Sequence, residues 1–179
     1  MKVFMGFMEI FRRKSENDCI INEIKEELIT KCKMQIAKLE KSNPDIYIVA
    51  ITCDSDINYV GIASNTSSYY ESIIKDEDMY YYYKYCESEW KNAITFSELS
   101  KKIQMAKEDR LDEEFDEFRK EIIQMCVAVA KEIKIVYPKL LITVCVEEFL
   151  GKEERINCIK EINGDESSEE YVSHIDDFV

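Results

Sequence analysis

Apolar residues in this sequence follow two spacings, and the order of those spacings along the chain constrains the fold more than any other feature. One apolar stripe recurs every three or four residues between residues 18 and 41, at Ile20, Ile24, Leu28, Cys32, Ile36 and Leu39. This spacing predicts an amphipathic helix that ends before Pro44, because proline disfavours helix in the residue before it. A second stripe with the same spacing predicts a long helix over residues 111–136, which ends before Pro138.

Three shorter runs are rich in β-branched and aromatic residues and predict strands. Two of them, residues 46–53 and 57–64, flank a polar turn, so we expect a β-hairpin over residues 46–64. The third strand lies within residues 139–147 and is apolar on both faces, which favours a central place in the sheet. The predicted fold is α+β, with a small, mainly antiparallel sheet packed by the N-terminal helix and the long helix.

The remaining stretches indicate the domain organisation. Short helices are expected near residues 65–74, 96–99 and 152–160, whereas periodicity does not separate helix from strand over residues 79–90. We predict an N-terminal extension over residues 1–17, a single domain over residues 18–163 and an acidic tail over residues 164–179. The tail carries six acids and no lysine or arginine, so we expect it to be disordered.

The charge of the chain excludes some classes of partner. There are 24 lysines and arginines against 37 acids, a net charge of −13 with the histidine neutral. Binding to nucleic acid or to an anionic membrane surface needs clustered basic residues, so neither is expected. A basic protein partner is compatible with this charge.

The cysteines and the apolar runs indicate a cytoplasmic protein. The seven cysteines are odd in number and include no C-x-x-C pair, which is typical of reduced thiols packed in a core. The apolar run at residues 3–8 is interrupted by Glu9 and has no cleavage site after it, so it does not predict a signal peptide. No run approaches the length of about 18 apolar residues that a membrane span needs.

The sequence is poor in groups that carry chemistry. His174 is the single histidine, and no glycine-rich phosphate-binding motif or zinc-type cluster is present. Acidic pairs such as Glu147 and Glu148 are too frequent to indicate a site, and we interpret them as solvated surface. We therefore expect a protein that is not an enzyme, with no catalytic residue, cofactor or bound metal.

A run of aromatic residues is the first candidate for partner binding. Tyrosine and tryptophan offer a large contact area at a low entropy cost, and five tyrosines and one tryptophan fall within residues 80–90. The alternative interpretation is that alternate tyrosines of a half-buried strand pack on the core. The candidates here, with the acids beside them, are Asp76, Glu77, Asp78, Tyr80, Tyr82, Tyr83, Tyr85, Glu89 and Trp90.

An acidic cluster over residues 108–117 is the second candidate. Two or three of its acids are explained by the dipole of the long helix, which favours negative charge at its N-terminus. The rest repel one another, and we interpret them as steering a basic partner. The candidates in this cluster are Asp109, Asp112, Glu113 and Asp116.

The order of elements resembles that of a known bacterial family. The features that carry the resemblance are Asn65-Thr66 after the hairpin, the Glu89-Trp90 pair and a long helix around Cys126. Over residues 18–163 the chain resembles a family of small α+β domains of unknown function. Members of this family look like immunity proteins found beside polymorphic toxins and contact-dependent growth-inhibition toxins.

This resemblance implies an immunity protein that neutralises the C-terminal domain of a cognate toxin, plausibly a basic nuclease, by covering its active site. The alternative is a small-molecule-binding or regulatory domain with an aromatic pocket around Tyr85 and Trp90. A closed pocket lined by those rings would favour the ligand, whereas a convex acidic face with exposed rings would favour the toxin. An enzyme that uses carboxylates alone would need two acids converging in a cleft, and the sequence does not indicate which two. It predicts no particular oligomeric state.

Overall fold

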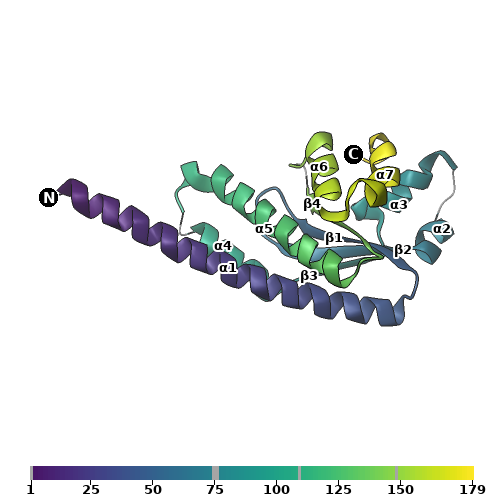
Figure 1. Ribbon diagram of the computed structural model, residues 1–179, viewed down its shortest axis with the longest axis horizontal. Coiled ribbons are helices and arrows are strands. Elements are labelled where there is room, and N and C mark those ends of the chain that lie inside the picture. The colour runs from purple at the N-terminus through teal and green to yellow at the C-terminus, as the bar shows by residue number, and fades with distance from the viewer. Residues whose placement is uncertain (1, 74–76, 109, 148) are drawn as a thin grey trace.

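The structure is a computed structural model, and it describes residues 2–73, 77–108, 110–147 and 149–179, with the side chains in these ranges except those of residues 2–18, 77 and 112 (Figure 1). The strands are β1 (Ile46–Cys53), β2 (Val60–Thr66), β3 (Asn92–Thr95) and β4 (Leu141–Val146). The helices are α1 (Lys2–Ser42), α2 (Ser67–Ile73), α3 (Tyr80–Tyr85), α4 (Ser97–Glu108), α5 (Phe115–Val136), α6 (Lys152–Asn163) and α7 (Asp165–Ser173). Short 3-10 helices are η1 (Glu77–Met79), η2 (Glu87–Glu89), η3 (Asp112–Glu114) and η4 (Ile175–Asp177).

The strands form one sheet in the order β3-β2-β1-β4. β1 pairs with β2 and β2 with β3 in antiparallel fashion, whereas β1 and β4 are parallel. This confirms the α+β class and the mainly antiparallel sheet. β3 was not predicted, because its four residues are too few to show a period.

The central place predicted for the last strand is wrong, since β4 lies at an edge of the sheet. It is apolar on both faces because α5 contacts one of them and α6 the other. Val144 belongs to the core beneath α5, whereas Cys145 belongs to the core on the opposite face. An apolar run therefore reports burial on two faces but does not report whether the strand has two neighbours.

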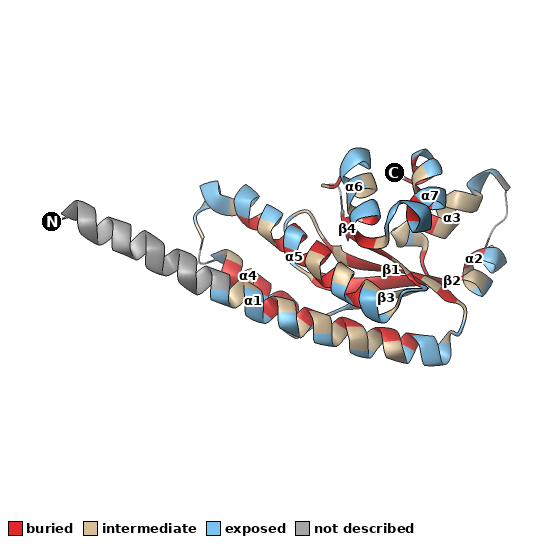
Figure 2. Cartoon of the chain, in the orientation of Figure 1, coloured by how far each residue is buried: buried red, intermediate tan, exposed pale blue. Residues whose placement is uncertain are grey.

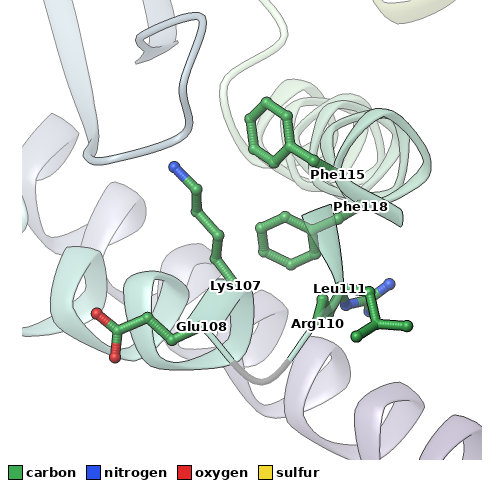
Figure 3. Close-up of a pocket in the computed structure, with 6 residues that line it drawn as sticks. All are labelled: Lys107, Glu108, Arg110, Leu111, Phe115 and Phe118. Atoms are coloured by element: carbon green, nitrogen blue, oxygen red, sulfur yellow. The ribbon is translucent and has the colours of Figure 1, made fainter. Parts of the chain in front are cut away.

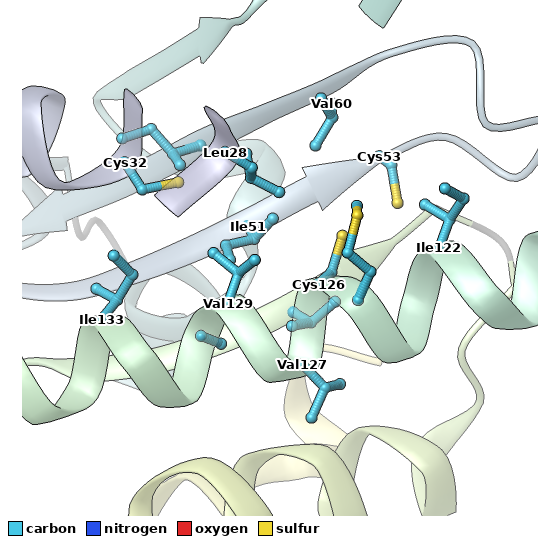
Figure 4. Close-up of a cluster of buried hydrophobic side chains, with 14 of the residues drawn as sticks. Leu28, Cys32, Ile51, Cys53, Val60, Ile122, Cys126, Val127, Val129 and Ile133 are labelled. Atoms are coloured by element: carbon cyan, nitrogen blue, oxygen red, sulfur yellow. The ribbon is translucent and has the colours of Figure 1, made fainter. Parts of the chain in front are cut away.

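The helices α1, α4 and α5 cover one face of the sheet (Figures 1 and 2). Figure 4 shows part of this core, where Leu28 and Cys32 of α1 face Ile51 of β1 and Val129 of α5. The apolar stripe predicted on the first helix is buried as expected. The helix begins at Lys2, so residues 2–17 of the predicted N-terminal extension are helical and continuous with it.

The helices α3, α6 and α7 cover the other face, and their side chains pack on Ile48 and Ala50 of β1. The expectation of a disordered tail is wrong, since residues 165–173 form α7 and the chain after it stays packed. Tyr171, Ile175 and Phe178 are buried and supply an apolar stripe at spacings of four and three residues.

Gly164 allows this packing. Its φ of 82° lies in the left-handed region that favours glycine, and its N–H donates to the carbonyl of Lys160 at 2.8 Å. The chain therefore ends α6 and turns at once into α7. No described helix combines the length and the apolar content needed to cross a membrane.

Candidate functional site

The structure separates the two acidic and aromatic segments that the sequence singles out. The tyrosine run forms α3 at one end of the molecule, whereas the acidic cluster lies at the start of α5 toward the opposite end (Figure 1). Among the candidates, Asp76 and Asp109 lie outside the described residues, as do the side chains of Glu77 and Asp112. A single contact surface does not include both segments.

Two of the predicted contact residues, Tyr85 and Trp90, are part of the core. Tyr85 is 3% exposed and Trp90 is 7% exposed. The ring of Tyr85 lies 5.1 Å from that of Tyr171 and 5.5 Å from that of Phe178, and its hydroxyl donates to Glu170 Oε2 at 2.7 Å. Tyr85 therefore holds α3 against the C-terminal segment and offers no exposed ring.

The other tyrosines of α3 are half-buried and are tied to their surroundings by their rings and hydroxyls. The ring of Tyr81 stacks on His174, with the two ring centroids 3.3 Å apart. The hydroxyl of Tyr82 donates to Glu89 Oε1 at 3.3 Å. The ring of Tyr81 therefore lies against the residue that follows α7, whereas the hydroxyl of Tyr82 contacts η2.

Most of the net negative charge of the chain lies on the sheet face that α3, α6 and α7 cover. Residues 77–89 carry four acids and one lysine, and residues 152–179 carry nine acids and three basic side chains. These two stretches, which we call the acidic layer, hold nine of the thirteen net negative charges. Figure 2 shows that the outer sides of α6 and α7 are exposed, and the acids lie there.

The nine net charges remain after the basic side chains of the layer are counted, and some of these side chains form ion pairs within it. Lys84 Nζ lies 2.8 Å from Glu170 Oε1, and Lys160 Nζ lies 3.2 Å from Asp165 Oδ1. Glu166 and Glu169 are exposed and form no ion pair with a described residue. Their charges are therefore available to attract a basic surface.

The predicted cluster at the start of α5, residues 108–117, carries seven acids and one arginine. Glu113 and Asp116 are exposed as expected, but Asp116 pairs with Arg119, and Arg110 Nη2 pairs with Glu121 Oε2 at 2.7 Å. Residues 97–136 as a whole carry ten acids and eight basic side chains. The basic residues of α4 and α5 lower the net charge of this longer segment to −2, and the sequence could not show that Arg119 folds back onto Asp116.

The surface beside this cluster has a pocket of about 410 Å³ between the end of α4 and the start of α5 (Figure 3). Its cations lie against aromatic rings: Lys107 Nζ is 4.8 Å from the centroid of Phe115, and the guanidinium of Arg110 is 4.7 Å from that of Phe118. Lys107 also donates to the carbonyl of Asp56 at 2.7 Å. These cations anchor the loop before β2 and the start of α5, which is a structural role.

A second candidate site is an open cleft of about 470 Å³ on the sheet face that carries the acidic layer. Its floor consists of small side chains from all four strands: Thr52, Ala63, Ala93, Thr95 and Cys145. One part of its wall comes from the loop before β2 and the end of β4, with Tyr59 and Glu147. The rest comes from η2, the residue after η2 and α6, with Glu87, Ser88, Trp90 and Arg155.

A mostly buried ion pair forms one wall of this cleft. Arg155 Nη1 donates to both carboxylate oxygens of Glu87, at 3.1 and 3.3 Å, and Arg155 Nε donates to the carbonyl of Leu150 at 3.2 Å. The thiol of Cys145 donates to the same carboxylate. Burial and the neighbouring Glu87 raise the pKa of the Cys145 thiol far above its ordinary value, so this thiol is not an activated nucleophile.

The opposite side of the cleft carries a carboxylate at the surface. The hydroxyl of Tyr59 donates to Glu147 Oε1 at 2.9 Å, and burial together with this carboxylate raises the pKa of the Tyr59 hydroxyl above its ordinary value. The indole N–H of Trp90 is buried and has no hydrogen-bond partner among the described residues. No group of three or more possible metal ligands occurs in the part of the chain that the structure describes.

Among the residues of this cleft, the sequence analysis singled out Trp90 as a contact residue and interpreted Glu147 as solvated surface, and it did not relate the two. Glu87 and Arg155 are 68 residues apart, and no local spacing relates them. The local sequence gives no signal for the pair: Glu87 lies between Cys86 and Ser88, and Arg155 lies between Glu154 and Ile156. Only the sheet brings the two together.

The chain belongs to a family described as "Domain of unknown function (DUF4303)", whose model matches residues 24–163. The match begins inside α1 and ends with α6, so α7 lies beyond it. No curated protein and no solved structure matches the chain.

Proposed function

We propose that this member of the DUF4303 family is a cytoplasmic immunity protein, which binds the C-terminal domain of a cognate toxin and neutralises it. The observation that supports the proposal is the acidic layer, where the half-exposed tyrosines of α3 lie beside α7 and where nine of the thirteen net negative charges gather. The binding surface is thus assigned to α3 and α7 rather than to the start of α5.

The chemistry of this surface suits a basic protein partner. Tyrosine rings supply contact area at a low entropy cost, and the ring of Tyr81 is already held by its stacking on His174. Unpaired carboxylates such as those of Glu166 and Glu169 repel one another in the free chain. A partner that brings lysines and arginines converts this repulsion into attraction.

Inhibition would follow from occupancy of the toxin's own substrate site. A nuclease needs a basic surface for phosphate groups, and carboxylates held on a folded layer can occupy it in the same way. Long-range attraction of this kind raises association rates by about one to three orders of magnitude at low salt. The proposal therefore predicts rapid association that slows as salt is added.

Charge reversal on the two surfaces tests the proposal. The double variant Glu166→Lys with Glu169→Lys changes exposed acids of α7, and the control Glu113→Lys with Glu117→Lys makes the same charge change at the start of α5. Stopped-flow association with the toxin domain encoded beside the gene should slow by about tenfold or more for the α7 variant at low salt. The control should stay within about threefold. Equal slowing by both variants, or no slowing by either, would refute the assignment of the surface.

The alternative, a ligand pocket around Tyr85 and Trp90, is supported only in part. Tyr85 is enclosed between Tyr171 and Phe178, so its ring lines no cavity. Trp90 does line the open cleft beside Glu87 and Arg155. This cleft suggests a second activity, at a site whose lining residues lie outside α3 and α7.

A further inference from the structure

The cleft is open because the side chains on its floor are small and because the helices α3, α6 and α7 do not extend over it. Ile48 and Ala50 of β1 are covered, but Thr52, two residues further along the same face, is only half-buried. Ala93 and Thr95 of the edge strand β3 are exposed. A volume of about 470 Å³ is within the range of small-molecule sites.

The charged groups of the cleft leave one carboxylate uncompensated. Each nitrogen of the Arg155 guanidinium donates a hydrogen bond. Nε donates to the Leu150 carbonyl, Nη1 to the Glu87 carboxylate, and Nη2 to the Cys145 sulfur at 3.6 Å. Glu147 accepts one hydrogen bond, from the neutral hydroxyl of Tyr59, and pairs with no cation among the described residues. An anion would find no free positive partner here, whereas a cation would find the Glu147 carboxylate.

Two aromatic side chains reinforce this preference. Tyr59 and Trp90 both line the cleft, and aromatic faces attract ammonium and guanidinium groups, with tryptophan the most favourable ring. The unpaired indole N–H of Trp90 is a separate signal, because a buried donor without a partner costs about 1–3 kcal/mol.

We propose that this cleft binds a compact organic cation, a guanidinium or ammonium group, which pairs with Glu147 between Tyr59 and Trp90. The cation belongs either to a free small molecule or to an arginine or lysine side chain presented by a protein. This binding site goes beyond the immunity function and does not depend on it, because the contacts that form it lie outside α3 and α7.

Trp90 allows a direct test, since it is the single tryptophan of the chain and its fluorescence reports on the cleft alone. The full-length protein is titrated at constant ionic strength with n-butylguanidinium, with N-acetyl-arginine amide and with N-acetyl-citrulline amide. The citrulline compound has the shape of the arginine compound without its charge. Both cations should give a saturable change in emission in the millimolar range, and the citrulline compound should give none.

Two variants locate the effect. Glu147→Gln keeps an acceptor for the Tyr59 hydroxyl but removes the charge, and should weaken cation binding by about five- to tenfold. Glu132→Gln removes the same charge from an exposed position on α5 and should leave binding within about twofold. Both positions are at the surface, so circular dichroism should show that both variants fold.

The outcomes separate the sources of the cation. Saturation by both cations supports a site that accepts a side chain on a peptide backbone, and saturation by n-butylguanidinium alone supports a site for a free small cation. The proposal is overturned if neither cation saturates, if the citrulline compound binds as well as the arginine compound, or if Glu147→Gln binds like the unaltered protein.

Discussion

The packing of the C-terminal segment makes a quantitative prediction about stability. Phe178 is 8% exposed, and its ring centroid lies 4.8 Å from that of Tyr171 and 5.5 Å from that of Tyr85. Replacing a buried phenylalanine with alanine costs about 3–5 kcal/mol when the surroundings do not relax. Phe178 is the penultimate residue, and the chain end can move into the space that the ring leaves. We therefore expect Phe178→Ala to lower the free energy of unfolding by about 2–3 kcal/mol.

The neighbouring residue is the matched control. Val179 is 52% exposed, so Val179→Ala should change the free energy of unfolding by less than about 0.5 kcal/mol. Urea denaturation followed by far-UV circular dichroism gives both values, and the two variants should share the slope of the unaltered protein. If Phe178→Ala unfolds at the same urea concentration as Val179→Ala, the C-terminal segment does not contribute to the core, and the acidic layer as described does not exist.

Three further predictions concern the sheet, the cleft and the contact between α3 and α7. Gly61→Ala should destabilise the domain by about 1–3 kcal/mol in urea denaturation, because a Cβ at this position would lie 2.2 Å from the carbonyl oxygen of Ile94. Arg155→Met should lower the free energy of unfolding by about 3 kcal/mol, since it leaves the Glu87 carboxylate mostly buried and unpaired. Adding Glu87→Gln should restore part of that stability in a double-mutant cycle. Glu170→Gln should flatten the loss of stability at acid pH. Burial raises the pKa of Glu170, but hydrogen bonds from Lys84 and Tyr85 outweigh burial and lower the pKa overall. The contribution of Glu170 to stability is therefore complete above the ordinary glutamate pKa and is lost as the pH falls through the lower folded-state pKa.

Each of these predictions has a control and a contrary result. Gly151→Ala should be close to neutral, because a Cβ there meets only the mobile end of the Glu154 side chain, and equal costs for the two glycines would contradict the close approach of β2 and β3. Additive effects in the Glu87 and Arg155 cycle would show that the pair is not coupled. Glu169→Gln, at an exposed position, should leave the pH profile of stability unchanged, and a profile for Glu170→Gln that also matches the unaltered protein would contradict the ion pair with Lys84.

The main elements of the fold could be predicted because each buries one face in a regular pattern. The stripe of α1 is an example: Ile24, Leu28, Cys32 and Ile36 alternate with exposed or half-exposed residues, so the helical period is visible in the sequence. Strand order is not visible in this way. β4 is apolar on both faces whether it lies at the centre or at an edge, since two helical layers cover it.

The tail shows how composition can hide a packed segment. Six acids and no basic residue in sixteen positions indicate disorder, yet three apolar residues at helical spacing bury one side of this segment. The acids lie on the other side, where they need no partner from the core. Spacing was therefore a better guide here than net charge.

The sequence and the structure lead to different proposals for the contact surface. The sequence favours the tyrosine run together with the acids at the start of α5, whereas from the structure we propose α3 and α7. Ion pairs such as that of Arg110 with Glu121 form between residues 11 positions apart and depend on how the chain folds. The contact of Lys84 with Glu170 joins residues 86 positions apart, so no local pattern could place α7 beside α3.

Hydrogen exchange of the complex tests the central claim most directly. The chain is mixed at equal concentration with the toxin domain that we propose as its partner, and amide exchange is compared with that of the free chain. The account predicts a stable complex in which the amides of α3 and α7 gain protection, whereas those at the start of α5 exchange as before. Protection confined to the start of α5, or no complex with the toxin domain, would contradict it.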